Sequence, residues 1–120
     1  MVDITPKIKD AIRRAHANSW YAYPAAWSSF PVCAFYLAGH GDYARADGRE
    51  YLARVAYQVD VWAGTPEEVA QVSGKIDAEL TGIGMQRESA MDLYEPDPTL
   101  YRRTMTYAAA VTPDGVIYEL

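Results

Sequence analysis

The sequence predicts an α+β fold, with a mainly antiparallel sheet of about four to five strands and two helices. The first observation behind this prediction is a regular alternation of side chains in the run Glu50–Ala63. Hydrophobic side chains occupy the odd positions: Tyr51, Ala53, Val55, Tyr57, Val59, Val61 and Ala63. Polar side chains in this run stand only at even positions. A period of two over this length predicts one long strand with one buried face.

The second observation is a change to helical periodicity directly after that strand. Thr65 can accept a hydrogen bond from the amide of Glu68, and Glu68 can reach back, which together make a capping box. Pro66 suits the first helical position, where no amide donor is needed. Hydrophobic residues then recur at helical spacing until two glycines end the pattern: Val69, Val72, Ile76 and Leu80, followed by Gly82 and Gly84.

An earlier helix is predicted from about Thr5 to Ala15. We interpret Thr5 as its cap and Pro6 as its first residue. One face carries the hydrophobic stripe Ile4, Ile8, Ala11, Ile12 and Ala15. The segment Trp20–Pro31 contains two prolines and is therefore expected to be extended and irregular.

The third observation is the punctuation of the rest of the chain by turn signals. Val32–Ala38 is apolar enough for a central strand, whereas the polar segment Gly39–Gly48 is expected to be a loop. Further strands are expected at about Met85–Glu95, Leu100–Val111 and Val116–Glu119, with turns at Pro96–Pro98 and Asp114–Gly115. Hairpin-like connections of this kind favour an antiparallel sheet, and residues 1–120 are expected to form a single domain.

Composition excludes several classes of partner. The chain has 11 Lys and Arg against 16 Asp and Glu, a net charge of −5, and its basic residues cluster at most in pairs. Specific binding of DNA or RNA is therefore not expected. No apolar run is long enough for a membrane span. The single cysteine, Cys33, excludes an internal disulfide and a Cys-based zinc site, and we interpret it as a small buried residue. We expect a soluble protein made in a reducing compartment.

The aromatic content points instead to protein contacts. Ten Tyr and three Trp are many for 120 residues. These side chains bury area while keeping a polar group, and they are enriched where proteins meet proteins. A tyrosine-rich sheet core is the alternative explanation, and it accounts for about half of them.

No motif in the chain predicts catalysis, a cofactor or a metal site. Neither His16 nor His40 has a metal-ligand partner one helical turn away. His40 could form an acid–base cluster with Asp42 and Asp47, although polar residues in such a segment more often serve turn chemistry. Asp60, in mid-strand beside Trp62, is the one carboxylate in a setting of the kind that perturbs a pKa, but a pairing with a neighbouring arginine is the simpler interpretation. We therefore predict that the protein is not an enzyme.

The outer face of the predicted sheet is only half polar, which suits a second layer or another subunit better than water. The first helix could cover part of it, and Trp62 would then pack inside its own subunit. The other interpretation makes this face and the Gly39–Gly48 segment a self-association surface. Its candidate residues are Glu50, Arg54, Asp60, Trp62, Arg102, Tyr43 and Arg45.

The order of these elements resembles the tail-terminator or tail-completion proteins of long-tailed bacteriophages and prophages. The resemblance covers roughly residues 32–111. It rests on Phe30-Pro31 entering an apolar strand and on the run Tyr57-Gln-Val-Asp-Val-Trp-Ala63. A helix opened by Thr-Pro-Glu-Glu-Val69 and closed by Leu80-Thr-Gly-Ile-Gly84 follows, and then the strand Tyr101-Arg-Arg-Thr-Met-Thr-Tyr107.

The resemblance implies a structural virion protein at the tail–neck joint. It implies a ring of identical subunits, six-fold in relatives, that ends the tail tube and docks it to the head connector. It also implies a lumen through which DNA passes without specific binding, and assembly in the host cytoplasm. Two alternatives remain: another neck component, such as a head-closure or connector-adaptor protein, and a small ligand-binding α+β domain that uses the Gly39–Gly48 segment.

Overall fold

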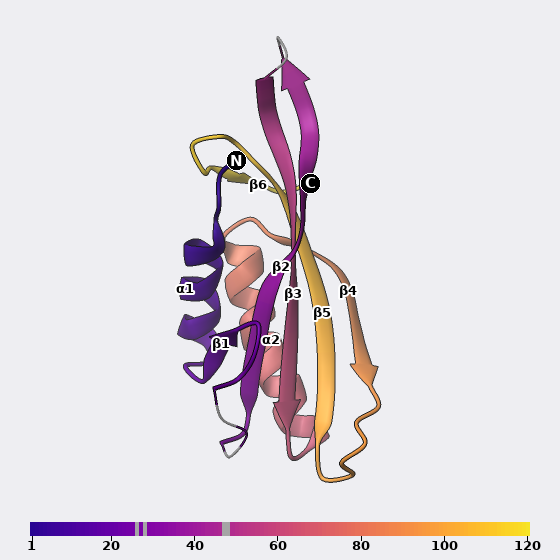
Figure 1. Ribbon diagram of the computed structural model, residues 1–120. Coiled ribbons are helices and arrows are strands. Elements are labelled where there is room, and N and C mark those ends of the chain that lie inside the picture. The colour runs from indigo at the N-terminus through magenta and orange to yellow at the C-terminus, as the bar shows by residue number, and fades with distance from the viewer. Residues whose placement is uncertain (26, 28, 47–48) are drawn as a thin grey trace.

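The computed structural model describes residues 1–25, 27, 29–46 and 49–120, and for residues 45, 46 and 49–51 it describes the backbone alone. Two helices and six strands follow one another in the described chain (Figure 1). In chain order they are α1 (Thr5–Ala15), β1 (Ser19–Tyr21), β2 (Val32–Ala46), β3 (Arg49–Ala63), α2 (Pro66–Gly82), β4 (Gln86–Leu93), β5 (Tyr101–Val111) and β6 (Ile117–Tyr118). The predicted α+β class is confirmed.

The strands form one sheet in the order β1-β2-β3-β5-β4, and β6 pairs with the end of β5. Every pair is antiparallel except β1 with β2. The prediction of a mainly antiparallel sheet is therefore confirmed, although the sheet has one strand more than expected. The additional strand is β1, which is only three residues long and too short to show a period in the sequence.

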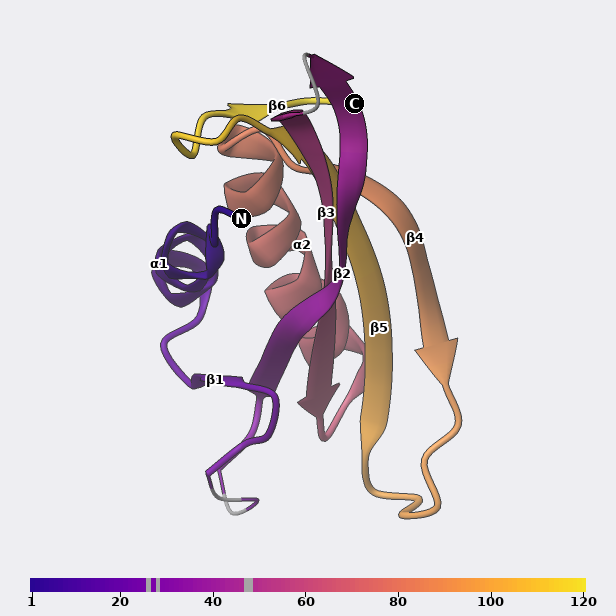
Figure 2. The same ribbon diagram turned by 45° about the horizontal axis from the view of Figure 1, so that its top comes forward.

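Both helices cover the same face of the sheet (Figure 2). The predicted odd positions of β3 point toward them, and Val55, Tyr57, Val59 and Val61 are fully buried there. They pack with the apolar stripe of α1, with Val72, Ile76 and Leu80 of α2, and with alternate residues of β2 and β5. This helix-covered face holds the main core, so the opposite, helix-free face is the one left to meet a partner.

The ends of α2 follow the predicted signals. The Thr65 hydroxyl oxygen accepts a hydrogen bond from the Glu68 amide at 3.2 Å, and it donates to the Glu68 carboxylate at 3.2 Å. At the other end the Gly84 amide donates to the Thr81 carbonyl and the Met85 amide donates to the Leu80 carbonyl, at 3.1 and 3.0 Å. This is a Schellman ending, and it needs the positive φ of 104° that Gly84 adopts.

The start of α1 differs from the prediction. Thr5 is the first helical residue, Ile4 precedes it as the cap residue, and no side chain caps from that position. Instead the Asp3 carboxylate accepts the Thr5 amide at 2.9 Å. The Thr5 hydroxyl lies 2.7 Å from the hydroxyl of Tyr57, a buried side chain that needs a polar partner.

The polar loop predicted for Gly39–Gly48 is wrong over its described part. Residues 39–46 continue strand β2, which pairs with β3 as far as Ala46 and Arg49. Glycines disfavour strands, but register shifts beside Gly39 and Ala44 absorb the irregularity. Asp47 and Gly48 lie outside the described residues.

We call the outer part of this hairpin, Gly39–Ala46 with Arg49–Ala56, the arm. The ladder of β3 with β5 ends at Ala53, so the arm beyond that point consists of two strands. It projects from the body in Figure 1 and lengthens the molecule to 54 Å against 24 and 23 Å in the other directions.

Candidate assembly interface

The helix-free face of the sheet carries most of the residues predicted as an interface. Side chains alternate along each strand, and cross-strand neighbours share a face, so its members follow from the strand register. They are Val32, Ala34 and Tyr36 of β2; Leu52, Arg54, Ala56, Gln58, Asp60 and Trp62 of β3; Arg102, Thr104, Thr106, Ala108 and Ala110 of β5; and Ser89, Met91 and Leu93 of β4.

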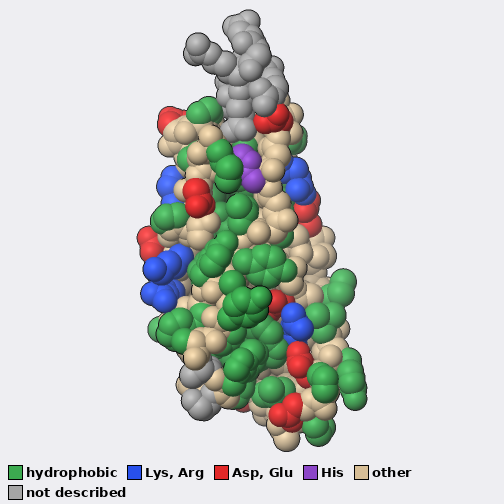
Figure 3. All heavy atoms as spheres, viewed as in Figure 1, with side chains coloured by type: hydrophobic (Ala, Val, Ile, Leu, Met, Phe, Trp, Pro, Cys, Tyr) green, Lys and Arg blue, Asp and Glu red, His purple; other side chains and the backbone are tan. Residues whose placement is uncertain are grey.

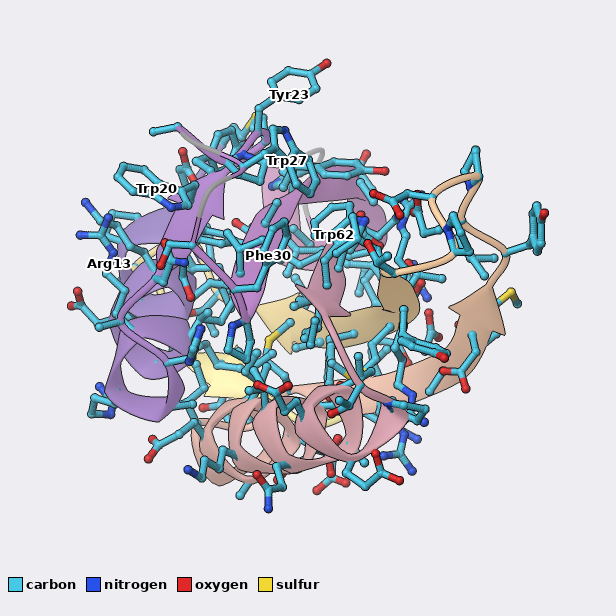
Figure 4. The ribbon with its side chains drawn as sticks, turned by 90° about the horizontal axis from the view of Figure 1, so that it is seen from below. Arg13, Trp20, Tyr23, Trp27, Phe30 and Trp62 are labelled. Atoms are coloured by element: carbon cyan, nitrogen blue, oxygen red, sulfur yellow. The ribbon has the colours of Figure 1, made fainter. Side chains whose placement is uncertain are left out.

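Trp62 forms the centre of a second, smaller core on this face. It is only 8% exposed and packs with Val32 and Ala34, with Phe30 against them. Trp27 stands edge-on to it, with ring centroids 5.0 Å apart, and Figure 4 shows the two rings beside each other. The indole nitrogen of Trp62 donates to Glu95 at 3.1 Å.

The cover over Trp62 therefore comes from the segment before β2, and we call its described residues, 22–25, 27 and 29–31, the strap. The alternative that α1 covers part of this face is wrong, because α1 packs on the opposite face with the main core. Trp62 nevertheless packs inside its own subunit, as that alternative had it. The hydrophobic stripe of α1 shows that one side of the helix is buried, but the sequence does not show which face of the sheet it packs against.

A partly buried ion cluster lies beside Trp62. Asp60 is 5% exposed, and Arg102 Nη2 lies 3.3 Å from its carboxylate. Arg102 also reaches Glu95 at 3.5 Å, and its guanidinium carbon lies 5.0 Å from the Trp62 ring centre. Gln58 donates weakly to Asp60 at 3.4 Å. The simpler interpretation of Asp60, a strand carboxylate paired with an arginine, is confirmed.

Arg54 makes a separate ion pair on the same face, closer to the tip of the arm. Its Nη2 contacts both carboxylate oxygens of Glu88, at 2.6 and 2.7 Å, so that the pair joins β3 to β4 across β5. Both side chains are 40% exposed, and an exposed pair of this kind contributes about 0–1 kcal/mol. The pair neutralises charge more than it stabilises the fold.

The remaining predicted residues lie on the arm. Tyr43 is 55% exposed and sits at a register shift in β2. Arg45 and Glu50 are cross-strand neighbours, and their side chains lie outside the described residues. The seven predicted residues thus fall into two groups: Asp60, Trp62 and Arg102 under the strap, and Arg54, Tyr43, Arg45 and Glu50 on or near the arm.

Comparison with known families places this geometry in context. The model of a family described as tail completion protein gp17 matches residues 7–112. The chain belongs to this family of phage tail completion proteins. No curated protein matches the chain. The matched range runs from the first turn of α1 to the end of β5, so it includes the strap, the arm and both helices.

Membership in the tail completion family confirms the predicted resemblance and assigns the chain a structural role in the phage tail. Such a protein belongs to the virion tail and contacts other tail or neck proteins. A structural tail family also suggests a non-enzymatic role. In the described part of the chain no group of three or more His, Cys, Asp and Glu could hold a metal ion, and no helix there could cross a membrane.

Cys33 is buried in the main core of this tail completion protein, as interpreted from the sequence. Burial raises the pKa of its thiol to about 12, so the sulfur stays protonated near neutral pH. His40, expected in a loop, instead lies in β2 opposite Val55.

The aromatic strap itself was not predicted from the sequence. A cleft of about 590 Å³ separates it from the sheet, with Tyr21, Tyr23, Trp27, Tyr36, Trp62 and Arg102 among its lining residues. Tyr23 is 83% exposed and points away from the body (Figure 4). The available signal was the run Tyr21-Ala-Tyr-Pro24 with Trp27, which places apolar rings in a segment with no regular element to bury them.

Figure 3 shows the result on the surface. Hydrophobic side chains gather over the lower half of this view, with an acidic and a basic side chain set among them. We call the exposed part of this surface the aromatic rim; its members are Tyr21, Tyr23 and Trp27. Large apolar side chains around a few fixed polar groups are typical of a protein–protein contact.

Proposed function

We propose that this tail completion protein forms a ring that terminates the tail tube and docks the tail to the head connector. The family match supports the tail role, and the helix-free face with its aromatic rim supports contact with further subunits. A tube that grows by adding identical rings always exposes one more identical edge, so a different protein has to occupy the last one. The single main core also supports the proposal that residues 1–120 form one domain.

The subunits of such a ring contact one another head to tail, and each therefore needs two different complementary patches. One proposed patch is the helix-free face, on which the aromatic rim is held in place by the buried group Asp60, Trp62 and Arg102. Trp62 then acts through Trp27, which it supports, since Trp62 itself is buried. The other proposed patch is the arm, where Tyr43 is exposed and Arg45, Glu50 and Arg54 are near. A six-fold ring follows the pattern expected from relatives.

The helix-free face of the subunit offers little attraction to DNA. Its described arginines are each engaged by carboxylates, Arg54 by Glu88 and Arg102 by Asp60 and Glu95. Paired arginines offer little net attraction to phosphates, and the whole chain carries a net charge of −5. This arrangement supports the proposal that DNA slides past the ring without specific binding.

A neck component on the head side, such as a head-closure or connector-adaptor protein, is the alternative. The two positions differ in which half of the particle the protein joins first. A tail protein co-purifies with free tails from a strain that makes no heads, whereas a head-side protein co-purifies with filled heads from a strain that makes no tails.

The test of the proposal is deletion of the gene in the phage or prophage that encodes it. We expect filled heads and tails that fail to join, or tails of uncontrolled length, and restoration of infectivity by the wild-type gene supplied in trans. Normal infectious particles from the deletion strain would rule the assignment out.

A further inference from the structure

Two glycines of the arm, Gly39 and Gly41, stand in a strand, and Gly41 has no explanation within the described chain. Neither Gly39 nor Gly41 has any atom within 4 Å of the position that a Cβ would take. The positive-φ glycines of the described residues are Gly84 and Gly115, so neither arm glycine is needed for a left-handed conformation. A register shift lies beside Gly39, but none lies beside Gly41. A glycine in a strand destabilises it by about 0.5–1 kcal/mol relative to alanine and often marks the close approach of another backbone.

The edge of β2 at these glycines is open in the described sheet. β1 pairs with β2 only at Cys33, Ala34 and Phe35. The amide of Leu37 donates to the hydroxyl of Tyr21 at 3.3 Å, which ends the contact of that segment with the edge. Beside Ala38–Gly41, β3 is the one neighbouring strand of the described chain. A further strand at this edge would pair with its open backbone amides and carbonyls.

The edge strand at the other end of the sheet, β4, runs in the opposite direction to β2. β4 has β5 as its one neighbour among the described strands, and nearly all of its residues are exposed. It contains no Pro or Lys, which commonly protect an edge. Its charged side chains form ion pairs within the same subunit: Arg87 with Asp77, Glu88 with Arg54 and Asp92 with Arg103. A register shift at Glu88 leaves Ser89–Leu93 as a regular edge.

We propose that β4 of one copy adds to the arm of the next copy beside Gly39 and Gly41, so that the sheet continues from subunit to subunit around the ring. β2 and β4 run in opposite directions, because three antiparallel steps separate them in the sheet. Two copies joined head to tail therefore form an antiparallel ladder, the more stable kind of pair. The contact uses two different edges of one chain, which a heterologous ring requires. The inference rests on the proposed ring and names its contact.

Cysteine pairs test this contact in assembled tails. His40 lies between the two glycines and pairs with Val55 on the helix-covered face, which Ala90 of β4 shares, whereas Ser89 and Met91 face the other way. His40→Cys, which leaves both glycines in place, is combined in turn with Ser89→Cys, Ala90→Cys and Met91→Cys. The native Cys33 is buried and gives little background.

The expected product of mild oxidation is a ladder of multimers that ends at the size of the ring. Ala90→Cys should cross-link to His40→Cys several-fold faster than either Ser89→Cys or Met91→Cys does, because neighbouring residues of a strand alternate in direction. Mixed single variants should stop at dimers, and each single variant alone should give no product.

Three results would overturn the inference. Cross-linking of a β4 single variant with itself would show that two β4 edges meet. Equal rates at residues 89, 90 and 91 would show a contact without a strand ladder. The third result is that none of the cysteine pairs cross-links although the protein is present at the end of the tail that joins the head. The contact between subunits of the ring would then lie elsewhere on the molecule. Tails without the protein at that end would instead refute the proposed function.

Discussion

Trp27 stands edge-on to Trp62, with ring centroids 5.0 Å apart and ring planes at 84°. This contact ties the strap to the helix-free face of the sheet. The two side chains have different roles. Trp62 is buried and packs against the strap, whereas Trp27 is half exposed and forms part of the aromatic rim.

Trp62→Ala is expected to destabilise the isolated subunit. Removing a buried Trp side chain costs about 3–5 kcal/mol, since the strap cannot collapse fully into the space. The midpoint of urea unfolding should therefore fall well below that of the wild type. Trp20→Ala is the matched control, because Trp20 is 37% exposed and its indole nitrogen donates only to Asn18, so its loss should cost about 1 kcal/mol or less. Unchanged stability of Trp62→Ala would show that its contacts contribute nothing inside the subunit.

Arg102→Ala is expected to destabilise the subunit through Asp60. The substitution leaves a carboxylate that is 5% exposed with Gln58 as its remaining described partner. Breaking a buried pair from one side costs about 3 kcal/mol or more. Arg103→Ala is the control, since Asp92 on the other end of that pair is 68% exposed and the pair is worth about 0–1 kcal/mol. Equal losses for the two arginine variants in urea unfolding would contradict this account of Asp60.

Two glycines, Gly84 just past the end of α2 and Gly74 inside it, should respond in opposite ways to alanine. Gly84 has a φ of 104°, and a Cβ there would lie 3.1 Å from the Cγ2 atom of Ile117, so Gly84→Ala should destabilise by about 1–2 kcal/mol. Gly74 lies inside α2 with open space around it, so Gly74→Ala should stabilise by about 0.5–1 kcal/mol. Thermal unfolding of both variants measures the difference, and a stabilised Gly84→Ala would refute the Schellman ending.

Alkaline pH should weaken the fold in a defined window. Burial raises the pKa of Cys33 and of Tyr57 to about 12 in each case. In the unfolded chain a cysteine ionises near about 8.5 and a tyrosine near about 10, so above those values the unfolded state binds fewer protons than the folded state. Stability is therefore fully present below about pH 8 and falls as the pH rises toward 12. In Cys33→Ala the fall should begin about one pH unit later; a urea midpoint that stays level from pH 8 to 11 would contradict this.

The regular elements could be predicted because their signals are local. The alternation around Val59 and the capping sequence at Thr65 each determine an element without help from the rest of the chain. The continuation of β2 past Gly39 could not be predicted, because its strand conformation comes from pairing with β3. The short strand β1 likewise exists only through its pairing with β2.

The candidate interface was predicted in part for the same reason. The strand residues Asp60, Trp62 and Arg102 were placed on one face by their spacing, and the structure brings them together. What the spacing could not show is that the strap returns over them, since that depends on contacts such as Trp27 with Trp62 between distant parts of the chain. The rim residues, Tyr23 above all, were therefore missed.

The central claim is that this protein occupies the end of the tail that joins the head. The most direct measurement is electron microscopy of intact particles in which a short peptide tag follows Leu120, a residue that is 38% exposed, labelled with a gold-coupled antibody. The account predicts gold at the junction between head and tail in joined particles and at one end of free tails. Gold along the tail, at the tip that contacts the host or on the capsid shell would contradict it.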